Sequence, residues 1–118
     1  MGLHEEDILL KDHEQEQLSH YSNATTDIEF RFPWGFDELW GIASRTDYDL
    51  TQHQTHSGQN LQYLDPETNE KYIPYVIEPS LGVERLFLAI LASAYKEETL
   101  ADGETRLNLQ LAPSLAPY

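Results

Sequence analysis

The sequence predicts an α+β fold in which an antiparallel sheet is flanked by helices. Residues 27–32 and 36–43 alternate apolar and polar side chains, as half-buried strands do, and residues 106–111 alternate again. Residues 81–98 instead repeat apolar side chains at three- and four-residue steps, which is the period of an amphipathic helix. These two periods in one chain of 118 residues favour a mixed fold with a single small domain.

The first two strands are expected to pair as an antiparallel hairpin across Pro33-Trp34-Gly35. One face of the first strand carries Ile28, Phe30 and Phe32. One face of the second strand carries Phe36, Glu38, Trp40 and Ile42. Trp34 and Trp40 are interpreted as core aromatic residues rather than platforms for nucleic-acid bases, because their surroundings are acidic.

The middle of the chain predicts a short helix and a hairpin loop. Residues 47–56 form the helix, with Thr46 or Asp47 as its N-cap and Ser57-Gly58 at its end. Residues 61–64 and 71–79 flank a turn-rich loop at residues 65–70. The helix over residues 81–98 is apolar on two sides and therefore requires cover on both. Its two apolar sides are Val83, Leu86, Phe87, Ile90, Leu91 and Ala94, and Leu88, Ala89 and Ala92.

Residues 77–85 bring three polar groups to one junction. Glu78 and Ser80 share a strand face, whereas Ile77 points into packing. Gly82 allows a tight turn, and Arg85 follows in the first turn of the helix with a planar fork suited to phosphate. A carboxylate, a hydroxyl and a guanidinium so placed can hold an ammonium group and a polyphosphate. On this run alone, the favoured interpretation is a surface junction in which Arg85 pairs with a local carboxylate.

Composition limits the kind of partner. The net charge is −14, from 21 acidic and 7 basic residues, and no Lys/Arg cluster predicts strong binding to a phosphate backbone. The absence of Cys excludes disulfides and thiolate metal sites. His53 and His56 have a helix-compatible spacing for a metal, but they are interpreted as surface residues because no matching ligands accompany them. Without a membrane-length apolar stretch or a signal peptide, a soluble cytoplasmic protein is expected.

Three segments divide the chain. Residues 1–20 are acidic and are expected to be solvated or poorly ordered. Residues 21–111 hold the predicted folded domain. Residues 112–118 are interpreted as the start of a linker toward a further domain.

Several stretches, taken in order, resemble the catalytic domain of glycyl-tRNA synthetase in its homodimeric, bacterial-type class II form. They read LSHYSNATTDIEF (18–30), FPWGFDELWGIA (32–43), RTDYDL (45–50) and KYIPYV (71–76). The run 77–85 that follows resembles class II motif 3, in which a strand leads into a helix with an ATP-binding arginine. The resemblance covers residues 6–118, and the ordered set is far more specific than motif 3 alone.

The resemblance implies a two-step reaction in which glycine and ATP give glycyl-adenylate and the glycine then passes to tRNA(Gly). It implies a glycine pocket lined by Glu78, Pro79, Ser80, Leu81 and Gly82, with Glu78 facing the ammonium. It implies ATP contacts from Glu38, Leu39, Gly82, Val83, Glu84 and Arg85. In this comparison Arg85 is the catalytic residue, and Glu38 could hold a Mg²⁺ ion on the phosphates.

The sequence also departs from the family. Motif 1, which builds the family's dimer interface, and motif 2, whose arginine grips the α-phosphate, have no counterpart, since no Phe-Arg-x-Glu strand precedes His20. The chain is therefore expected to be the motif 3 part of a catalytic domain and inactive alone, with tRNA contacts made by the full-length enzyme. Two alternatives stay open: a noncatalytic ligand-binding or interaction module with the same fold, and a remnant without function.

Overall fold

The computed structural model describes residues 2–116, and these form an α+β fold, as the two sequence periods predicted. The strands and helices in chain order are β1 (Ile8–Asp12), β2 (Ala24–Phe32), β3 (Gly35–Ser44), α1 (Tyr48–Ser57), β4 (Tyr63–Leu64), β5 (Lys71–Tyr72), β6 (Ile77–Leu81), α2 (Val83–Ala94), β7 (Tyr95–Thr99) and β8 (Thr105–Leu109). Single 3-10 turns at Glu5–Asp7 and Gln15–Gln17 flank β1. None of the helices within residues 2–116 has the length and apolar content needed to cross a membrane.

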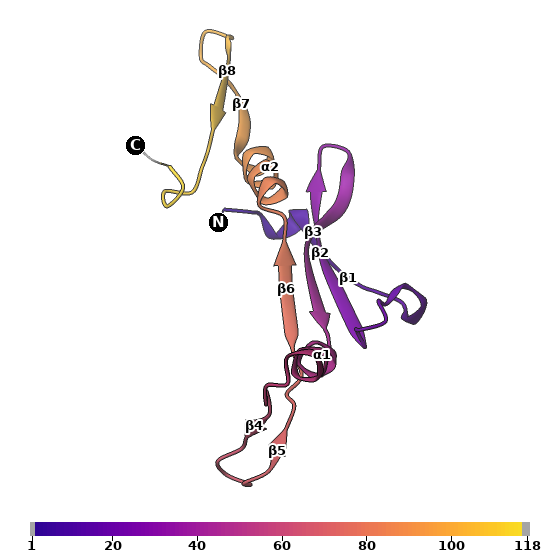
Figure 1. Cartoon of the computed structure of the whole chain (residues 1–118). Coiled ribbons are helices and arrows are strands. Elements are labelled where there is room, and N and C mark those ends of the chain that lie inside the picture. The colour runs from indigo at the N-terminus through magenta and orange to yellow at the C-terminus, as the bar shows by residue number, and fades with distance from the viewer. Residues whose placement is uncertain (1, 117–118) are drawn as a thin grey trace. The chain divides into compact units, whose positions relative to one another are not determined.

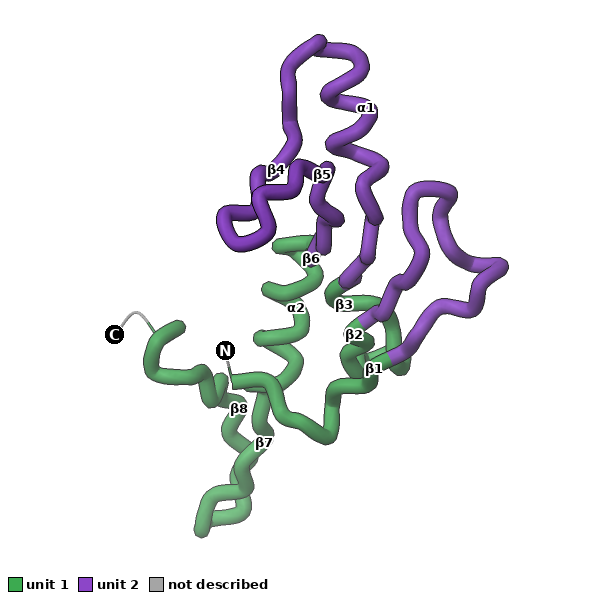
Figure 2. The backbone as a smooth tube through the Cα atoms, turned by 90° about the horizontal axis from the view of Figure 1, so that it is seen from below, with its two compact units in different colours: residues 1–10, 28–40, 81–118 green, residues 11–27, 41–80 purple. Residues whose placement is uncertain are grey.

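The strands form one four-stranded sheet and two ribbons (Figure 1). The order of the larger sheet is β1-β2-β3-β6, and the pairs β4-β5 and β7-β8 are antiparallel. The chain separates into two compact units (Figure 2). Unit 1 comprises residues 1–10, 28–40 and 81–118, and unit 2 comprises residues 11–27 and 41–80.

The core of unit 1 lies between the β2–β3 hairpin and α2. Phe30 and Phe32 of β2, Leu39 of β3 and Ala89 of α2 are buried together. The two phenylalanine rings meet edge to face with centroids 5.1 Å apart, a favourable aromatic geometry. The predicted inner face of the first strand is therefore confirmed at these two residues.

The predicted inner face of the second strand is wrong at the hairpin end. Leu39 is buried, whereas Phe36 is 46% exposed, because the opposite pleat of β3 points into the core. The interpretation of Trp34 as a core residue is also wrong, since its side chain lies in the turn between β2 and β3 and is 60% exposed. Trp40 is half-buried, and its indole nitrogen is enclosed without a hydrogen-bond partner among the described residues.

The helix predicted over residues 81–98 is shorter than expected, because residues 95–98 belong to strand β7. Helix α2 ends at Ala94, where Tyr95 adopts an extended backbone. Tyr95–Thr99 then pairs with Thr105–Leu109 as the β7–β8 hairpin beyond α2 (Figure 1), so only the second strand of this ribbon was predicted. Pairing of Tyr95 with Leu109 and of Glu98 with Arg106 supplies cross-strand contacts that the sequence period of the helix does not reveal.

The apolar faces of α2 differ from the predicted ones as well. The side toward the core carries Leu86, Ala89 and Ala92, taken from both predicted stripes. From the first predicted stripe, Val83 and Phe87 are 72% and 63% exposed, whereas Ala94 of the same stripe is buried.

Unit 2 contains the short helix and the hairpin loop that the sequence predicted. Helix α1 ends at Gly58, which adopts a left-handed conformation with φ 68° and donates from its N–H to the carbonyl of Gln54. The turn between β4 and β5 begins at Asp65, and the backbone N–H of Glu67 donates to its Oδ1 at 2.8 Å and lowers the pKa of that carboxyl. The N-terminal acidic segment contains a strand, β1, which its charge pattern did not indicate.

Candidate functional site

Arg85, a predicted ATP-contacting residue of unit 1, contacts the β2–β3 hairpin through its guanidinium. Arg85 lies in the first turn of α2, after Gly82 as the N-cap. Its Nη2 donates to Oδ2 of Asp37 at 3.0 Å, and its Nη1 donates to the backbone carbonyl of Glu38. The structure thus brings Arg85 and the predicted Glu38 together, through the main chain of β3. It also realises the alternative in which Arg85 pairs with a local carboxylate.

Gly82, which was predicted to allow a tight turn, does not adopt a conformation that favours glycine. Its backbone is extended, with φ −83° and ψ 120°, a conformation open to any residue. A Cβ at this position would meet side-chain carbons of Arg85 at 3.8 and 3.9 Å, an ordinary contact distance. The backbone conformation alone therefore does not require glycine here.

Asp37 connects three donors at the hairpin end. Its Oδ2 accepts from Arg85 and from the indole Nε1 of Trp34 at 3.2 Å, and its Oδ1 accepts from the backbone N–H of Glu38 at 2.8 Å. The hydrogen bond from Arg85, followed by that from Trp34, holds the pKa of Asp37 below its usual range. Asp37 is consequently an anion at neutral pH and orients the Arg85 fork.

Two aromatic rings complete this cluster. The rings of Phe32 and Trp34 are stacked, with centroids 4.8 Å apart and an interplanar angle of 1°. The guanidinium carbon of Arg85 lies 5.6 Å from the centroid of Phe32, within the range of a cation–π contact. A planar cation and two planar rings therefore lie at one end of the β2–β3 hairpin.

Glu38 and Leu39 differ in what they can offer a nucleotide. The side chain of Glu38 is exposed, and no protein group among residues 2–116 forms a hydrogen bond or ion pair with its carboxylate. Carboxylate oxygen is a ligand that Mg²⁺ prefers, and the described residues contain no group of three or more His, Cys, Asp and Glu side chains that could hold a metal. A Mg²⁺ ion here would thus depend on phosphate oxygens and water. Leu39 belongs to the core, so an ATP contact from it would have to come from its backbone.

In unit 2, the predicted glycine-contacting Glu78 is held by an arginine. Nη1 of Arg45 donates to Oε2 of Glu78 at 2.7 Å, and Nε and Nη2 of Arg45 donate to the two oxygens of Asp49 at 2.6 and 2.9 Å. The Arg45 guanidinium also lies 3.9 Å above the ring of Tyr21. Its hydrogen bonds to Asp49 and Glu78 raise the pKa of Arg45, and the same contact lowers the pKa of Asp49. Each of the three guanidinium nitrogens of Arg45 thus donates to one of these carboxylates, which restrains the position of Glu78.

The backbone beside Arg45 is strained and tied down. Thr46 has φ 54°, an unusual value for a β-branched residue. The N–H of Arg45 donates to the carbonyl of Val76, and the N–H of Val76 donates to the carbonyl of Thr46, each at 2.9 Å. These two bonds stabilise the strained conformation and set the direction in which the Arg45 side chain leaves the chain.

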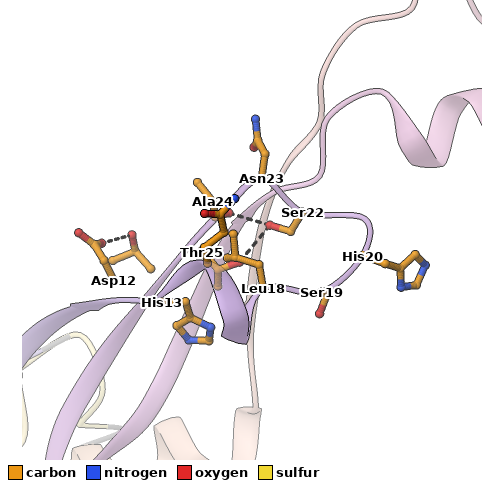
Figure 3. Close-up of a pocket in the computed structure, with 11 residues that line it drawn as sticks. Asp12, His13, Leu18, Ser19, His20, Ser22, Asn23, Ala24 and Thr25 are labelled. Carbon is orange, nitrogen blue, oxygen red and sulfur yellow. Dashed lines mark hydrogen bonds between the residues drawn. The ribbon is translucent and has the colours of Figure 1, made fainter.

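A separate pocket of about 760 Å³ lies in unit 2, around the turn before β2 (Figure 3). Its wall carries Asp12, hydrogen-bonded to the Thr26 hydroxyl at 2.6 Å, and Ser22, which donates to the carbonyl of Ala24 at 2.8 Å. None of the predicted site residues lines it.

Comparison with known proteins identifies the family. No protein-family model matches the chain. The whole chain of 118 residues is 64% identical to the glycine--tRNA ligase of Geobacillus thermodenitrificans and 62% identical to that of Geobacillus kaustophilus. Over 117 residues it is 61% identical to the glycine--tRNA ligase of Ruminiclostridium cellulolyticum. The chain spans about a quarter of the length of these curated relatives, 25–26%.

The chain corresponds to a segment of the glycine–tRNA ligase family. The resemblance read from the sequence is thereby confirmed at this level. The predicted site residues belong to two sets, each described within its own unit. Glu78, Pro79 and Ser80 belong to unit 2, and Glu38, Leu39 and residues 81–85 belong to unit 1.

Three charged residues that organise these sets, Arg45, Asp49 and Asp37, were not predicted. Arg45 and Asp49 have the four-residue spacing of a helical ion pair, a signal that the sequence did contain. Asp37 precedes the predicted Glu38 in an alternating strand, and nothing local distinguishes it from a solvent-facing carboxylate. Its partner Arg85 is 48 residues away, so only the folded chain reveals the pair.

Proposed function

We propose that this chain supplies glycine- and ATP-contacting residues to the class II catalytic domain of a glycine–tRNA ligase. The observation that carries the proposal is the match over the whole chain, at 58–64% identity, to proteins named glycine--tRNA ligase. The held side chains of Glu78 and Arg85 are consistent with it, because each offers a preoriented charge at the surface. Such preorganisation is what a site for a zwitterion and a polyphosphate needs.

The reaction proposed for the whole enzyme has two steps. The carboxylate of glycine attacks the α-phosphorus of ATP, forming glycyl-adenylate and releasing pyrophosphate. A ribose hydroxyl at the 3′ end of tRNA(Gly) then attacks the glycyl carbonyl, and AMP leaves. Protein groups assist both steps mainly by position and charge, because phosphoryl and acyl centres develop negative charge on oxygen.

At the amino-acid end, Glu78 is the proposed partner of the glycine ammonium. Arg45 occupies its Oε2, so Oε1 stays available to accept a hydrogen bond from the ammonium. Ser80 offers a hydroxyl on the same strand, and Pro79, Leu81 and Gly82 are proposed to line the pocket. Discrimination against larger amino acids must come from steric exclusion, since glycine has no side chain to contact.

At the nucleotide end, Arg85 is the proposed phosphate or adenine contact. Its fork is anchored by Asp37 and by the carbonyl of Glu38, which limits the entropy lost when a ligand binds. The exposed carboxylate of Glu38 would hold Mg²⁺, which neutralises charge on the phosphate oxygens when bound. Gly82, Val83 and Glu84 form the exposed start of α2 beside Arg85 and are the remaining proposed ATP contacts, with the Leu39 backbone.

The rest of the relatives' length, about three quarters, is proposed to supply what this segment does not contain: the α-phosphate arginine of motif 2, the dimer interface of motif 1 and the contacts to tRNA(Gly). The net charge of −14 agrees with tRNA contacts made elsewhere. The segment alone is then expected to be inactive, and a cytoplasmic location follows from the proposed role in translation.

The test is complementation by a second chain that carries motifs 1 and 2. Glycine-dependent ATP–pyrophosphate exchange should appear only in the mixture, and it should fall at least about 100-fold with Glu78→Gln or Arg85→Ala in this chain. Glu70→Gln and Arg106→Ala are matched controls on exposed turns and ribbons, and they should leave exchange unchanged. A mixture of two folded chains without exchange would refute the proposal.

One observation favours a second candidate, a noncatalytic ligand-binding module. The Arg85 fork is already bonded to Asp37 and Glu38, as in a structural arginine. This module would bind ATP or glycine, and lose that binding with Arg85→Ala or Glu78→Ala, but would give no exchange in any mixture. Isothermal titration of the chain with each ligand, run beside the exchange assay, separates the two functions.

A further inference from the structure

The most exposed aromatic ring beside Arg85 is that of Trp34. Its side chain is 60% exposed, and it lies in the turn between β2 and β3. A tryptophan ring with this much surface in water is costly, since indole is the largest apolar side chain and Trp is highly buried on average. A turn residue with only a structural role would not need such a ring.

Two contacts hold the Trp34 ring in one orientation. One face stacks on Phe32, a core residue that is 2% exposed, at a centroid distance of 4.8 Å. The indole Nε1 donates to Oδ2 of Asp37 at 3.2 Å, and the same oxygen accepts from Arg85. Because Phe32 covers one face and the ring edge is bonded to Asp37, the large exposed area includes the opposite face. The ring is thus a rigid, flat, open surface beside a guanidinium.

We propose that the indole of Trp34 is a stacking platform for an unpaired nucleobase, adjacent to the phosphate-binding fork of Arg85. This inference rests on the proposed function, because it assigns a base contact to the same nucleotide-binding end. Stacking suits this surface better than ion pairing, since Asp37 offsets the charge of Arg85 and the whole chain carries −14. Every base has a π face, so a platform of this kind accepts any base without reading its edges.

The base can come from a free nucleotide or from the unpaired end of an RNA strand, and both present the same ring with a phosphate nearby. The preorganised indole lowers the entropy cost for either ligand, because its two side-chain torsions are already restricted. Phe36, on the same hairpin and 46% exposed, stacks on no aromatic ring within residues 2–116 and serves as a matched comparison.

The experiment measures ligand binding to the whole 118-residue chain by equilibrium dialysis. The probes are ATP, inorganic tripolyphosphate, which lacks a base, and a short single-stranded oligoribonucleotide. Trp34→Leu should weaken ATP or RNA binding about 5- to 150-fold, the loss expected for one base–aromatic stack. Trp34→Tyr should retain most of the affinity, and Phe36→Leu should retain all of it. Circular dichroism of each variant verifies that it is folded.

Fluorescence gives an independent reading on a folded chain. The sequence has two tryptophans, so a Trp40→Phe background leaves Trp34 as the only indole. ATP or the oligoribonucleotide should quench its emission, whereas tripolyphosphate should not. A response to ATP alone assigns the platform to the free nucleotide, and a response to the oligoribonucleotide alone assigns it to an RNA end.

The outcomes separate this proposal from the proposed function. Equal affinity of wild type and Trp34→Leu for both base-bearing probes overturns the platform. If Arg85→Ala then still abolishes ATP and tripolyphosphate binding, the phosphate contact of the proposed function stands. Absence of binding by the wild-type chain to all three probes overturns the platform, whereas the proposed function is decided by the exchange assay with the complementing chain.

Discussion

Replacement of Phe30 by alanine tests whether this segment folds around the core of unit 1. Phe30 is 1% exposed and is the largest side chain among the described residues that is fully buried. It packs edge to face on Phe32, and the cluster also includes Leu39 and Ala89. Phe32 in turn supports Trp34 and Arg85, so the candidate nucleotide end depends on this core.

The size of the effect follows from the burial of one aromatic ring. A Phe-to-Ala change in a core removes the transfer free energy of the ring and leaves a cavity, for a total of about 3–5 kcal/mol. The described part of the chain has only a small buried apolar core, formed by Phe30, Phe32, Leu39, Ala89 and Ala94. Domains of this size are stable by about 5–15 kcal/mol, and a small core places this one at the low end. Phe30→Ala should therefore remove most of the folding free energy.

The assay is urea unfolding followed by far-ultraviolet circular dichroism. With an m-value of about 2 kcal/mol per molar, the midpoint should fall by about 2 M, if a folded baseline remains at all. Phe36→Ala is the matched control, since it makes the same change on the exposed face of the next strand and should cost less than about 1 kcal/mol. Phe30→Leu keeps most of the volume and should cost less than about 1.5 kcal/mol.

Equal midpoints for Phe30→Ala and Phe36→Ala would refute the reasoning. That result would mean that the ring of Phe30 gains nothing from its surroundings in solution. It would also remove the support assumed for Trp34 and Arg85 and favour the interpretation of the segment as a remnant without function.

Three further changes have expected outcomes. Arg85 lowers the pKa of Asp37 in the folded chain. The stability contributed by Asp37 is therefore complete above its unfolded pKa and is lost as the pH falls through its folded pKa. The difference in urea midpoint between wild type and Asp37→Asn should be constant above about pH 5 and vanish in stronger acid. A difference that persists unchanged to pH 2 would contradict the ion pair. Gly58→Ala should destabilise the chain by about 1–2 kcal/mol in the same urea assay, because Gly58 has φ 68° and a side chain at this φ is strained. No atom lies near the position of an added Cβ, so backbone strain is the only cost. An unchanged stability would argue against the left-handed conformation at the end of α1. Thr46→Asn should leave stability unchanged or raise it by up to about 1 kcal/mol, because Asn tolerates φ 54° better than a β-branched residue. A large loss would indicate that the hydrogen bond from the Thr46 hydroxyl to the carbonyl of Arg45 stabilises the chain by more than the backbone strain costs.

Local sequence patterns predicted the elements that are specified by residues close together in the chain. The strand at Phe30 and Phe32, the helix ending at Gly58 and the loop beginning at Asp65 are each specified by residues within a few positions. The signals are the alternation of apolar and polar side chains, a glycine in the left-handed conformation and an aspartate that accepts a hydrogen bond within its own turn. Each of these signals acts over a few residues. The sequence therefore contains enough information for them without the rest of the fold.

The misassigned residues depend on partners that are distant in the chain or on the order of the sheet. Tyr95 leaves the helix because it pairs with Leu109, and an apolar period cannot show this pairing. Ile77 was expected to point into packing but is 61% exposed, since β6 is the edge strand of the sheet. The ion pairs of Arg45 with Glu78 and of Arg85 with Asp37 span 33 and 48 residues. The sequence thus supplied the charged groups of the candidate site but not the groups that orient them.

The exposed apolar side of α2 makes self-association sensitive to salt. Val83 and Phe87 lie in water in this chain, and burial of such a face favours association. The net charge of −14 opposes it at low ionic strength, where the Debye length is about 30 Å at 0.01 M salt, and much less at 1 M, where it is about 3 Å. The apparent mass in sedimentation equilibrium should therefore rise with sodium chloride. Phe87→Lys should stay monomeric across the series, and Lys96→Glu, which adds charge away from this face, should shift the rise to higher salt. A wild-type chain that is monomeric at every salt concentration would show that the exposed face is too small to drive association. It would also show that charge repulsion is not what prevents copies of the chain from associating.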